Sequence, residues 1–438
     1  MGERAGVIRV AFLGALKGVS KWPNVHFDTE ARARELMSSL RSRHPDVEFV
    51  GGDVVHDRES CDRLIGELGS LGEEAMVLFN LASSWFVRPE LVAKLPTAVI
   101  SDPLLWGYAG MVSLSHAIRS TGARAFIVSS SDWADIDRAV DVIKAYLRLR
   151  RSKLLLVGRG YLGDLESVRE LGVEVEVLGY DELLEEYERA SEEEARGVAR
   201  SLVERAVRVV EPSFEEVVRS ARLYLAIRRV LERHRADGVA IDCLGGFARG
   251  DLPAYPCLAF MLLDDEGKYV TACENDLDSL LTKLVMKHVA GRPGFLCEPA
   301  IDTSRGLAIY AHCVAPTRMA GYSERGEPFV IRSHAEDDKG ACAQVLFRSG
   351  IPVTVTKIVP SERRVLLLRG TLLGHVDVDM GCRCKAAVRV GDAQRLIDEW
   401  QHSWHRVLLY GDWAREVEMF AKLAGYEVYR EGQSLYSR

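Results

Sequence analysis

The chain has 438 residues, of which 47% are hydrophobic and 28% charged, and this length favours several domains over a single core. The net charge of -7 comes from interspersed acidic and basic residues, so we expect no nucleic-acid partner and no membrane partner. The nine cysteines form no CxxC pair, and neither a signal peptide nor a membrane span is evident, so we expect reduced thiols and a cytoplasmic location.

Short apolar segments alternate with amphipathic helices over residues 1–150, which indicates a parallel sheet with helices on both faces. The predicted strands are residues 7–14, 47–53, 75–81, 97–102 and 124–130. Asp53, Asn80 and Asp102 would lie at the carboxyl edge of this sheet, where such folds bind ligands, but turn or cap roles are favoured for each. The predicted loops also hold Trp22, Trp85 and Trp106, for which we expect subunit contacts rather than stacking on a sugar.

A second α/β pattern occupies residues 151–290. Its predicted strands are 153–158, 173–179, 238–243, 257–267 and 268–273, with a long charged helical region over 181–232. From residue 291 the pattern changes to short β runs separated by Gly, Pro and Asp, which favours an antiparallel barrel or sandwich. We therefore expect an α/β protein with two doubly wound parallel-sheet domains, 1–150 and 151–290, followed by an antiparallel β-barrel domain, 291–438.

The glycines Gly158, Gly160 and Gly163 match the GxGxxG spacing of dinucleotide-binding turns, and Asp181 lies near the position of a ribose-binding acid. An NAD-linked oxidoreductase is therefore one alternative. We favour a tight turn that opens the second domain, because glycines at strand-to-helix turns are common for backbone reasons. No nucleotide cofactor is expected.

Three candidate metal ligands each lie at the edge of a predicted apolar strand, namely Glu274, Glu298 and His405. Carboxylates and a neutral imidazole suit Mn²⁺, Mg²⁺ or Co²⁺. Each of these residues taken alone is more often an ordinary polar strand end, and their wide separation in sequence gives no ligand spacing.

Residues 272–298, ACENDLDSLLTKLVMKHVAGRPGFLCE, resemble the L-fucose/L-arabinose isomerase family, in which a strand ending in a metal-binding Glu leads into a helix and a second acid-ending strand. The segments PAYPCLAFMLLDDEG, AIYAHCVAP, GCRCKAAVRV and WHRVLLYGD are similar to neighbouring family strands in the same order. The resemblance extends over roughly residues 238–415.

The resemblance implies that Glu274 and Glu298 are metal ligands and the acid/base pair, that His405 is the third ligand, and that His312 is a fourth ligand or faces the substrate. Fucose-type enzymes usually have Asp where this chain has Glu298, and an aromatic residue is commoner than Pro299. Beside Glu274, Asn275 and Asp276 are candidates for holding its orientation.

The implied activity is aldose–ketose isomerisation of a free sugar such as L-fucose, L-arabinose or D-arabinose through an enediol, with Mn²⁺, Co²⁺ or Mg²⁺ as cofactor. The implied assembly is a homo-oligomer, a trimer or hexamer. The alternatives are a phosphorylated or sulfonated sugar as substrate, or a sugar-binding protein without turnover. His402 is an alternative to His405, and Cys382, Cys384 and His375 suggest soft-metal binding, although packing is favoured for them.

Overall fold

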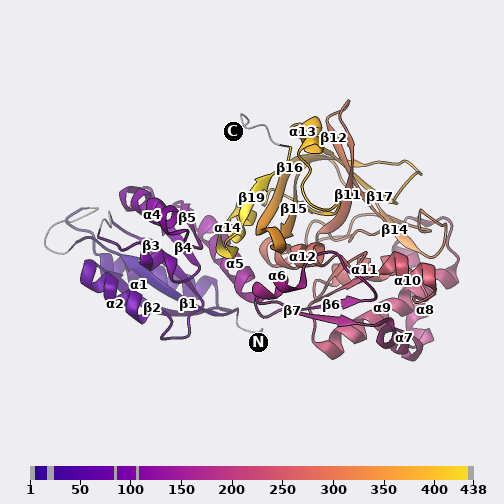
Figure 1. The fold of residues 1–438 in the computed structure, drawn as a ribbon, viewed down its shortest axis with the longest axis horizontal. Coiled ribbons are helices and arrows are strands. Elements are labelled where there is room, and N and C mark those ends of the chain that lie inside the picture. Colours follow the sequence, from indigo (N-terminus) through magenta and orange to yellow (C-terminus); the bar gives the residue numbers. More distant parts are fainter. Residues whose placement is uncertain (1–4, 17–23, 83–85, 105–107, 433–438) are drawn as a thin grey trace. The chain divides into compact units, whose positions relative to one another are not determined.

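The computed structural model describes residues 5–16, 24–82, 86–104 and 108–432, which separate into two compact units (Figure 1). Unit 1 is the described part of Met1–Arg148 with Glu416–Glu427, and unit 2 that of Leu149–Arg415 with Val428–Arg438. The three-domain division stays a prediction. The contacts predicted for Trp22, Trp85 and Trp106 lie outside the described residues.

Unit 1 is built on a five-stranded parallel sheet of order β2-β1-β3-β4-β5. The second strand lies on one side of β1, and the strands that follow it lie on the other side. Its strands are β1 (Val7–Leu13), β2 (Glu48–Val55), β3 (Ala75–Asn80), β4 (Thr97–Ser101) and β5 (Ala125–Ser129). Its helices are α1 (Thr29–Arg43), α2 (Arg58–Glu67), α3 (Glu90–Ala93), α4 (Tyr108–Thr121), α5 (Trp133–Leu149) and α14 (Ala414–Ala424).

Unit 2 contains a second parallel sheet, of order β10-β9-β6-β7. Strand β7 lies on one side of β6, and the later strands β9 and β10 lie on its other side. Its strands are β6 (Lys153–Val157), β7 (Glu174–Leu178), β9 (Gly238–Ile241) and β10 (Val270–Ala272). The helices that follow these strands or connect them are α6 (Leu165–Glu170), α7 (Tyr180–Arg189), α8 (Glu192–Arg205), α9 (Phe214–His234), α10 (Cys243–Arg249), α11 (Cys257–Glu266) and α12 (Leu277–Ala290).

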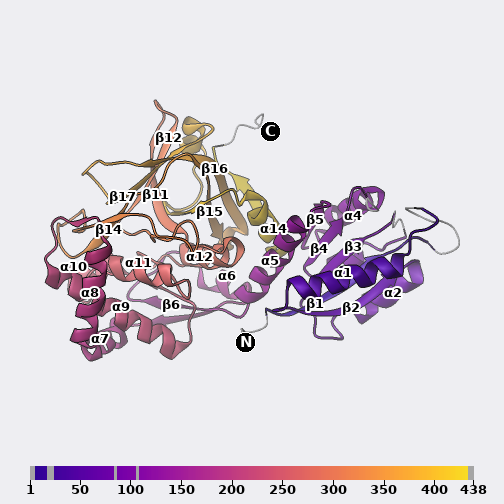
Figure 2. The ribbon, with the colours of Figure 1, turned by 180° about the vertical axis from the view of Figure 1, so that it is seen from behind.

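Six antiparallel strands of unit 2 close into a barrel in the order β15-β18-β11-β12-β17-β16, with β16 pairing back to β15 (Figures 1 and 2). The strands are β11 (Phe295–Asp302), β12 (Leu307–His312), β15 (Ile351–Val359), β16 (Arg364–His375), β17 (Cys384–Arg389) and β18 (Arg406–Tyr410). The remaining elements are β8 (Arg208–Val209), β13 (Phe329–Arg332), β14 (Cys342–Val345), β19 (Glu427–Arg430), η1 (Pro360–Glu362) and α13 (Ala393–Asp398). The mixed α/β class, with parallel sheets followed by an antiparallel barrel, is confirmed.

Helix α12 joins the parallel sheet of unit 2 to the barrel, since it contacts β9 and β10 on one side and β15 and β18 on the other. Its amino-terminal end begins directly after β10, and Asp276 caps it by accepting a hydrogen bond from the Ser279 amide at 2.8 Å. A carboxylate at this position stabilises a helix by satisfying an unpaired amide. The cap therefore anchors the segment that carries Glu274.

Two expectations about elements near Glu274 and Glu298 are wrong. Residues 257–267 form a helix, α11, rather than a strand, because ten residues rich in Leu, Met and Ala between Pro256 and Gly267 favour a helix when no alternation is present. Glu298 is not at a strand end, since β11 continues to Asp302. The charged region 181–232 is helical as expected and consists of α7, α8 and α9, with Ser191 and Ser213 capping the second and third.

Candidate metal centre

Glu274 lies in a strained turn between β10 and α12. Glu274 and Asn275 both have left-handed backbone conformations, with φ of 54° and 52°, which non-glycine residues adopt only where the surroundings hold them. Asn275 supplies those restraints. Its amide donates to the Ile241 carbonyl at 3.0 Å, its carbonyl accepts from the Leu162 amide at 3.1 Å, and its side-chain Nδ2 donates to the Gly160 carbonyl at 2.5 Å.

The GxGxxG loop packs against this turn. The Leu277 amide donates to the Leu162 carbonyl at 2.9 Å, and Leu162 and Asp276 form an isolated parallel bridge. A Cβ on Gly163, whose φ is +106°, would lie 2.7 Å from Asp278 Oδ1. A Cβ on Gly158 would lie 2.4 Å from the Tyr180 hydroxyl. Close packing thus accounts for both outer glycines, Gly163 against the start of α12 and Gly158 against Tyr180 and Asp242.

Both predicted histidines converge on the Glu274 carboxylate. His405 directly precedes β18 and His312 ends β12, and β11 separates these two strands in the barrel. His312 Nε2 lies 3.6 Å and His405 Nε2 3.7 Å from Glu274 Oε1. The ligand atoms of the three residues all lie within 4.8 Å of one another. Both imidazoles are buried, and the Glu274 side chain is 25% exposed.

The three residues fit a divalent metal ion. Their N···O separations are too long for hydrogen bonds, whereas metal–ligand bonds of about 2.1 Å place neighbouring donor atoms roughly 3.0 to 3.5 Å apart. Within the described part of the chain, His405 Nε2 is buried without a hydrogen-bond partner. Buried polar atoms are rarely left in this state unless a ligand or water satisfies them.

Charge within the group favours an anionic Glu274 and a cationic His405 while no metal is bound. Burial alone would raise the pKa of Glu274, but the nearby imidazoles of His312 and His405 hold it well below its usual range. Burial alone would lower the pKa of His405, but Asp276 and Glu274 raise it to about 9. An incoming cation therefore meets a ready carboxylate and must displace a proton from His405.

Glu298 is not part of this group, since the described residues whose ligand atoms converge are Glu274, His312 and His405. On β11 it pairs with Ala311, the neighbour of His312, and Cys297 pairs with Arg406, the neighbour of His405. Its Oε1 is 4.0 Å from Cys382 Sγ. Glu298 lines a cavity of about 320 Å³ whose other walls are mostly apolar, formed by Pro299, Ala300, Ile309, Ala311, Val376, Val378, Met380, Gly381, Cys382 and Lys385.

Two residues beside the group hold His405 in place. Asp276 is fully buried, and its Oδ2 lies 2.8 Å from His405 Nδ1. The sequence suggested that Asp276 holds the orientation of Glu274, but its side chain contacts the His405 ring and orients that ring. Sequence analysis missed Lys357, whose Nζ lies 2.9 Å from the same carboxylate oxygen. The signal for it was a single lysine within the apolar and β-branched strand IPVTVTKIV.

The alternative ligands lie elsewhere. His402 is placed between Asp278 and Glu362, with ring nitrogens 3.1 Å from a carboxylate oxygen of each. His375 Nε2 is 3.1 Å from the Gln344 side chain. In the described part of the chain, neither joins a cluster of three metal-ligating groups. All nine cysteines are described, and none forms a disulfide.

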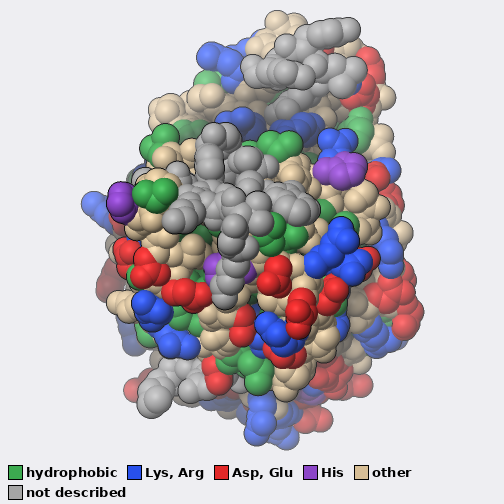
Figure 3. All heavy atoms as spheres, turned by 90° about the vertical axis from the view of Figure 1, so that its left-hand side faces the viewer, with side chains coloured by type: hydrophobic (Ala, Val, Ile, Leu, Met, Phe, Trp, Pro, Cys, Tyr) green, Lys and Arg blue, Asp and Glu red, His purple; other side chains and the backbone are tan. Residues whose placement is uncertain are grey.

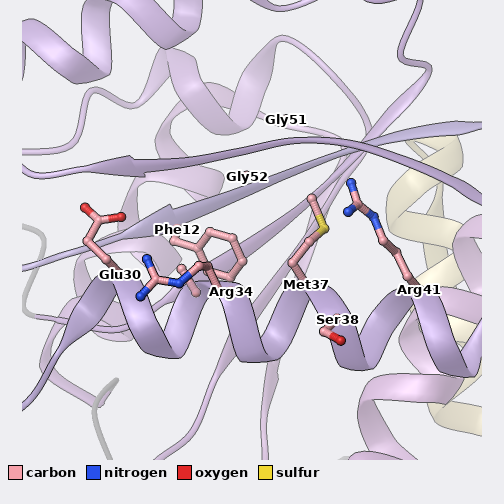
Figure 4. Close-up of a pocket in the computed structure, with 9 residues that line it drawn as sticks. Phe12, Glu30, Arg34, Met37, Ser38, Arg41, Gly51 and Gly52 are labelled. Carbon is pink, nitrogen blue, oxygen red and sulfur yellow. The ribbon is translucent and has the colours of Figure 1, made fainter.

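The polar residues predicted at the carboxyl edge of the unit 1 sheet have local partners, and Asp53 lies within β2 rather than at its end, because the strand continues to Val55. Asp53 pairs with Arg9 at 2.6 Å, Asn80 donates to Ser101 Oγ at 3.2 Å, and Asp102 accepts from the Leu104 amide at 2.8 Å. Figure 4 shows a separate hollow of about 360 Å³ in unit 1, between α1 and the bend of β2 at Gly51 and Gly52. A Cβ on Gly52 would lie 3.5 Å from Met37, which also lines the hollow, whereas a Cβ on Gly51 would meet Arg9 at 2.5 Å.

Charged side chains are intermixed on the face of the molecule shown in Figure 3, where acidic and basic groups lie side by side. Among the described residues, no helix has both the length and the apolar character required to cross a bilayer.

Comparisons with known proteins name no family. No protein-family model and no curated protein matches the chain. Among solved structures it is similar to a LacI family transcriptional regulator from Bifidobacterium animalis subsp. lactis, with 13% identity, 66% of this chain and 92% of that chain covered, and a TM-score of 0.17. It is also similar to the structure described as XylFII molecule, with 11% identity, 65% of this chain and 94% of that chain covered, and a TM-score of 0.17. At such TM-scores these likenesses carry no argument about function.

Proposed function

We propose that this protein is a divalent-metal-dependent aldose–ketose isomerase of the L-fucose/L-arabinose isomerase type. The observation that carries the proposal is the convergence of Glu274, His312 and His405, three residues from distant parts of the sequence that the resemblance marks as ligands. Their donor set of one carboxylate and two imidazoles suits Co²⁺ or Mn²⁺ better than Mg²⁺, because Mg²⁺ prefers oxygen ligands.

In this proposal Glu274, His312 and His405 hold the ion. A bound divalent cation would supply Lewis-acid stabilisation of negative charge on the two sugar oxygens next to the reacting carbons. Isomerisation itself moves one proton from C2 of the open-chain aldose to C1 and a second from the C2 hydroxyl to the C1 oxygen. The protein must therefore provide a group that accepts the proton from C2 and returns it to C1.

Glu298 is the residue we assign to that proton transfer. It lies outside the convergent group, which leaves its carboxylate free of a ligand role, and it is flanked in the barrel by the strands that carry His312 and His405. It also lines the cavity of about 320 Å³, whose volume is in the range of small-ligand pockets. Glu274 remains the alternative acid, as the family resemblance implies.

The decisive experiment is a ketose-formation assay on a panel of free aldoses, with protein stripped by EDTA and then supplied with Mn²⁺. Turnover should appear only after Mn²⁺ is added. Glu274→Gln and His405→Asn should remove it, because each deletes a ligand. Glu298→Gln should lower turnover by at least about a hundredfold while metal binding persists, since general-base catalysis typically contributes ~10²–10⁴-fold.

His402→Asn is the matched control, because this histidine lies three residues from His405 and contacts Asp278 and Glu362 instead of the group. It should retain Mn²⁺-dependent turnover. Tight Mn²⁺ binding without turnover on any free sugar would redirect the proposal to a phosphorylated or sulfonated sugar, or to binding alone. Failure to bind a divalent cation would overturn the assignment of all three ligands.

A further inference from the structure

Lys357 is a buried cation whose three donors are all used. Its side chain on β15 is 1% exposed, and a lysine so buried is costly unless its ammonium group is fully hydrogen-bonded. Its Nζ lies 2.9 Å from Asp276 Oδ2, 3.2 Å from Ser279 Oγ and 2.8 Å from Ser403 Oγ. Three donors thus meet three acceptors.

These acceptors belong to the two segments that supply Glu274 and His405. Asp276 follows Glu274 by two residues, and Ser403 precedes His405 by two residues. One ammonium group therefore ties the turn after β10 to the loop before β18, although these segments lie more than a hundred residues apart in the sequence.

The same ammonium group acts on the His405 ring through Asp276. Asp276 Oδ2 contacts both Lys357 Nζ and His405 Nδ1, at 2.9 and 2.8 Å. With Nδ1 engaged by a carboxylate, the ring turns Nε2 toward Glu274 Oε1. Carboxylates that bond the second nitrogen of a ligand histidine are known to fix its orientation and to tune metal affinity.

We propose that Lys357 is a positioning residue for the metal centre, holding Asp276 and Ser403 so that Glu274 and His405 meet at the distance an ion requires. This inference rests on the metal-binding part of the proposed function. The competing explanation is that Lys357 only stabilises the fold. Unit 2 offers a matched pair for that comparison, because Lys283 and Asp264 form an equally buried ion pair, at 2.5 Å, with no contact to the three ligands.

The test compares Lys357→Met with Lys283→Met in the full chain. Mn²⁺ affinity is measured by titration calorimetry, the geometry of the centre by the visible absorption of bound Co²⁺, and folding by thermal unfolding. Lys357→Met should weaken Mn²⁺ binding by about 10- to 100-fold and change the Co²⁺ spectrum. Lys283→Met should lose stability but keep the affinity and spectrum of the original protein.

Two milder variants apply if Lys357→Met does not fold. Ser403→Ala removes only one of the three acceptors and should weaken Mn²⁺ binding several-fold. In a double-mutant cycle, Ser403→Ala and Asp276→Asn should have non-additive effects on Mn²⁺ affinity, because both act through the same ammonium group. Strictly additive effects would contradict a shared anchor.

The two proposals fail in different ways. If the original protein binds Mn²⁺ and forms ketose while Lys357→Met binds Mn²⁺ with the same affinity and the same Co²⁺ spectrum, the positioning role is overturned and the proposed function stands. If the original protein binds no divalent cation, the metal centre itself is overturned, and the positioning role with it.

Discussion

His405 Nδ1 lies 2.8 Å from Asp276 Oδ2, and neither side chain has any exposed surface. This contact leaves Nε2 of the same ring to face Glu274 Oε1 at 3.7 Å. The position of one candidate ligand is therefore set by a carboxylate from the segment that carries another, so protein contacts alone arrange the candidate site. Preorganisation of this kind reduces the conformational cost of binding.

Metal binding should raise the thermal stability of the chain. A ligand present at a hundred times its dissociation constant stabilises the folded state by about 2.7 kcal/mol when the unfolded chain does not bind it. Differential scanning calorimetry of EDTA-stripped protein, with and without excess Mn²⁺, measures this shift. Glu274→Gln should show little or no shift, and a full shift in that variant would place the ion elsewhere.

Mn²⁺ affinity should depend on pH with a definite sign. Asp276 and Glu274 raise the pKa of His405 to about 9 in the metal-free protein, so near neutrality the ion must displace a proton. The apparent affinity should rise about tenfold for each unit from pH 6 to pH 8, because metal and proton compete for one nitrogen. Titration calorimetry in buffers of different ionisation enthalpy counts the released protons, and release of none would contradict this account.

The same pKa shift affects the metal-free fold. Because the folded pKa of His405 lies above its unfolded value, the shift stabilises the folded state below pH 6.5, and this stability is lost as the pH rises through about 9. Denaturant unfolding of stripped protein across this range should show the decline. The loss of stability with rising pH should be smaller in His405→Asn than in the original protein. An equal loss in both proteins would show that other groups cause it.

Gly163→Ala should destabilise the protein more than Gly160→Ala. Both glycines have positive φ, of +106° and +70°, so each substitution carries backbone strain, which costs ~1–2 kcal/mol for alanine in the left-handed region. At Gly163 the added methyl would also meet Asp278 Oδ1 at 2.7 Å, whereas at Gly160 it meets open space. Urea unfolding measures the difference. Equal losses would show that the contact with Asp278 is relieved at no cost.

Glu431→Gln should destabilise unit 2 strongly. Arg406 and Glu431 are fully buried and paired through two hydrogen bonds, of 3.0 and 2.6 Å. Removal of one partner leaves a buried charge without compensation and typically costs about 3–5 kcal/mol. Chemical denaturation of the variant measures this loss, and a change below about 1 kcal/mol would mean that water or another group replaces the carboxylate.

Local patterns predicted the strands of unit 1 and the change to short β runs after residue 291, because buried strands are short apolar runs bounded by turn residues. They failed at α11, where an unbroken apolar run carries no periodicity that separates a helix from a strand. They also placed Glu298 at a strand end, although β11 continues past Pro299 to Asp302. A glutamate followed by a proline after an apolar run resembles a strand boundary even where the ladder continues.

The candidate ligands were predicted from resemblance rather than from spacing. His312, given two possible roles from the sequence, lies in the convergent group, whereas Glu298, given a ligand role, lies outside it. Whether His312 or Glu298 joins the group depends on the barrel register, since the register determines which side chains of neighbouring strands meet. Lys357 was missed for the same reason, because its partners Asp276 and Ser403 lie 81 and 46 residues away in the sequence.

The most direct test of the metal centre is anomalous X-ray diffraction from crystals of the protein soaked in Mn²⁺. The account predicts one strong manganese peak within about 2.3 Å of Glu274 Oε1, His312 Nε2 and His405 Nε2. A peak bound by other residues, or no ordered peak at saturating Mn²⁺, would contradict it.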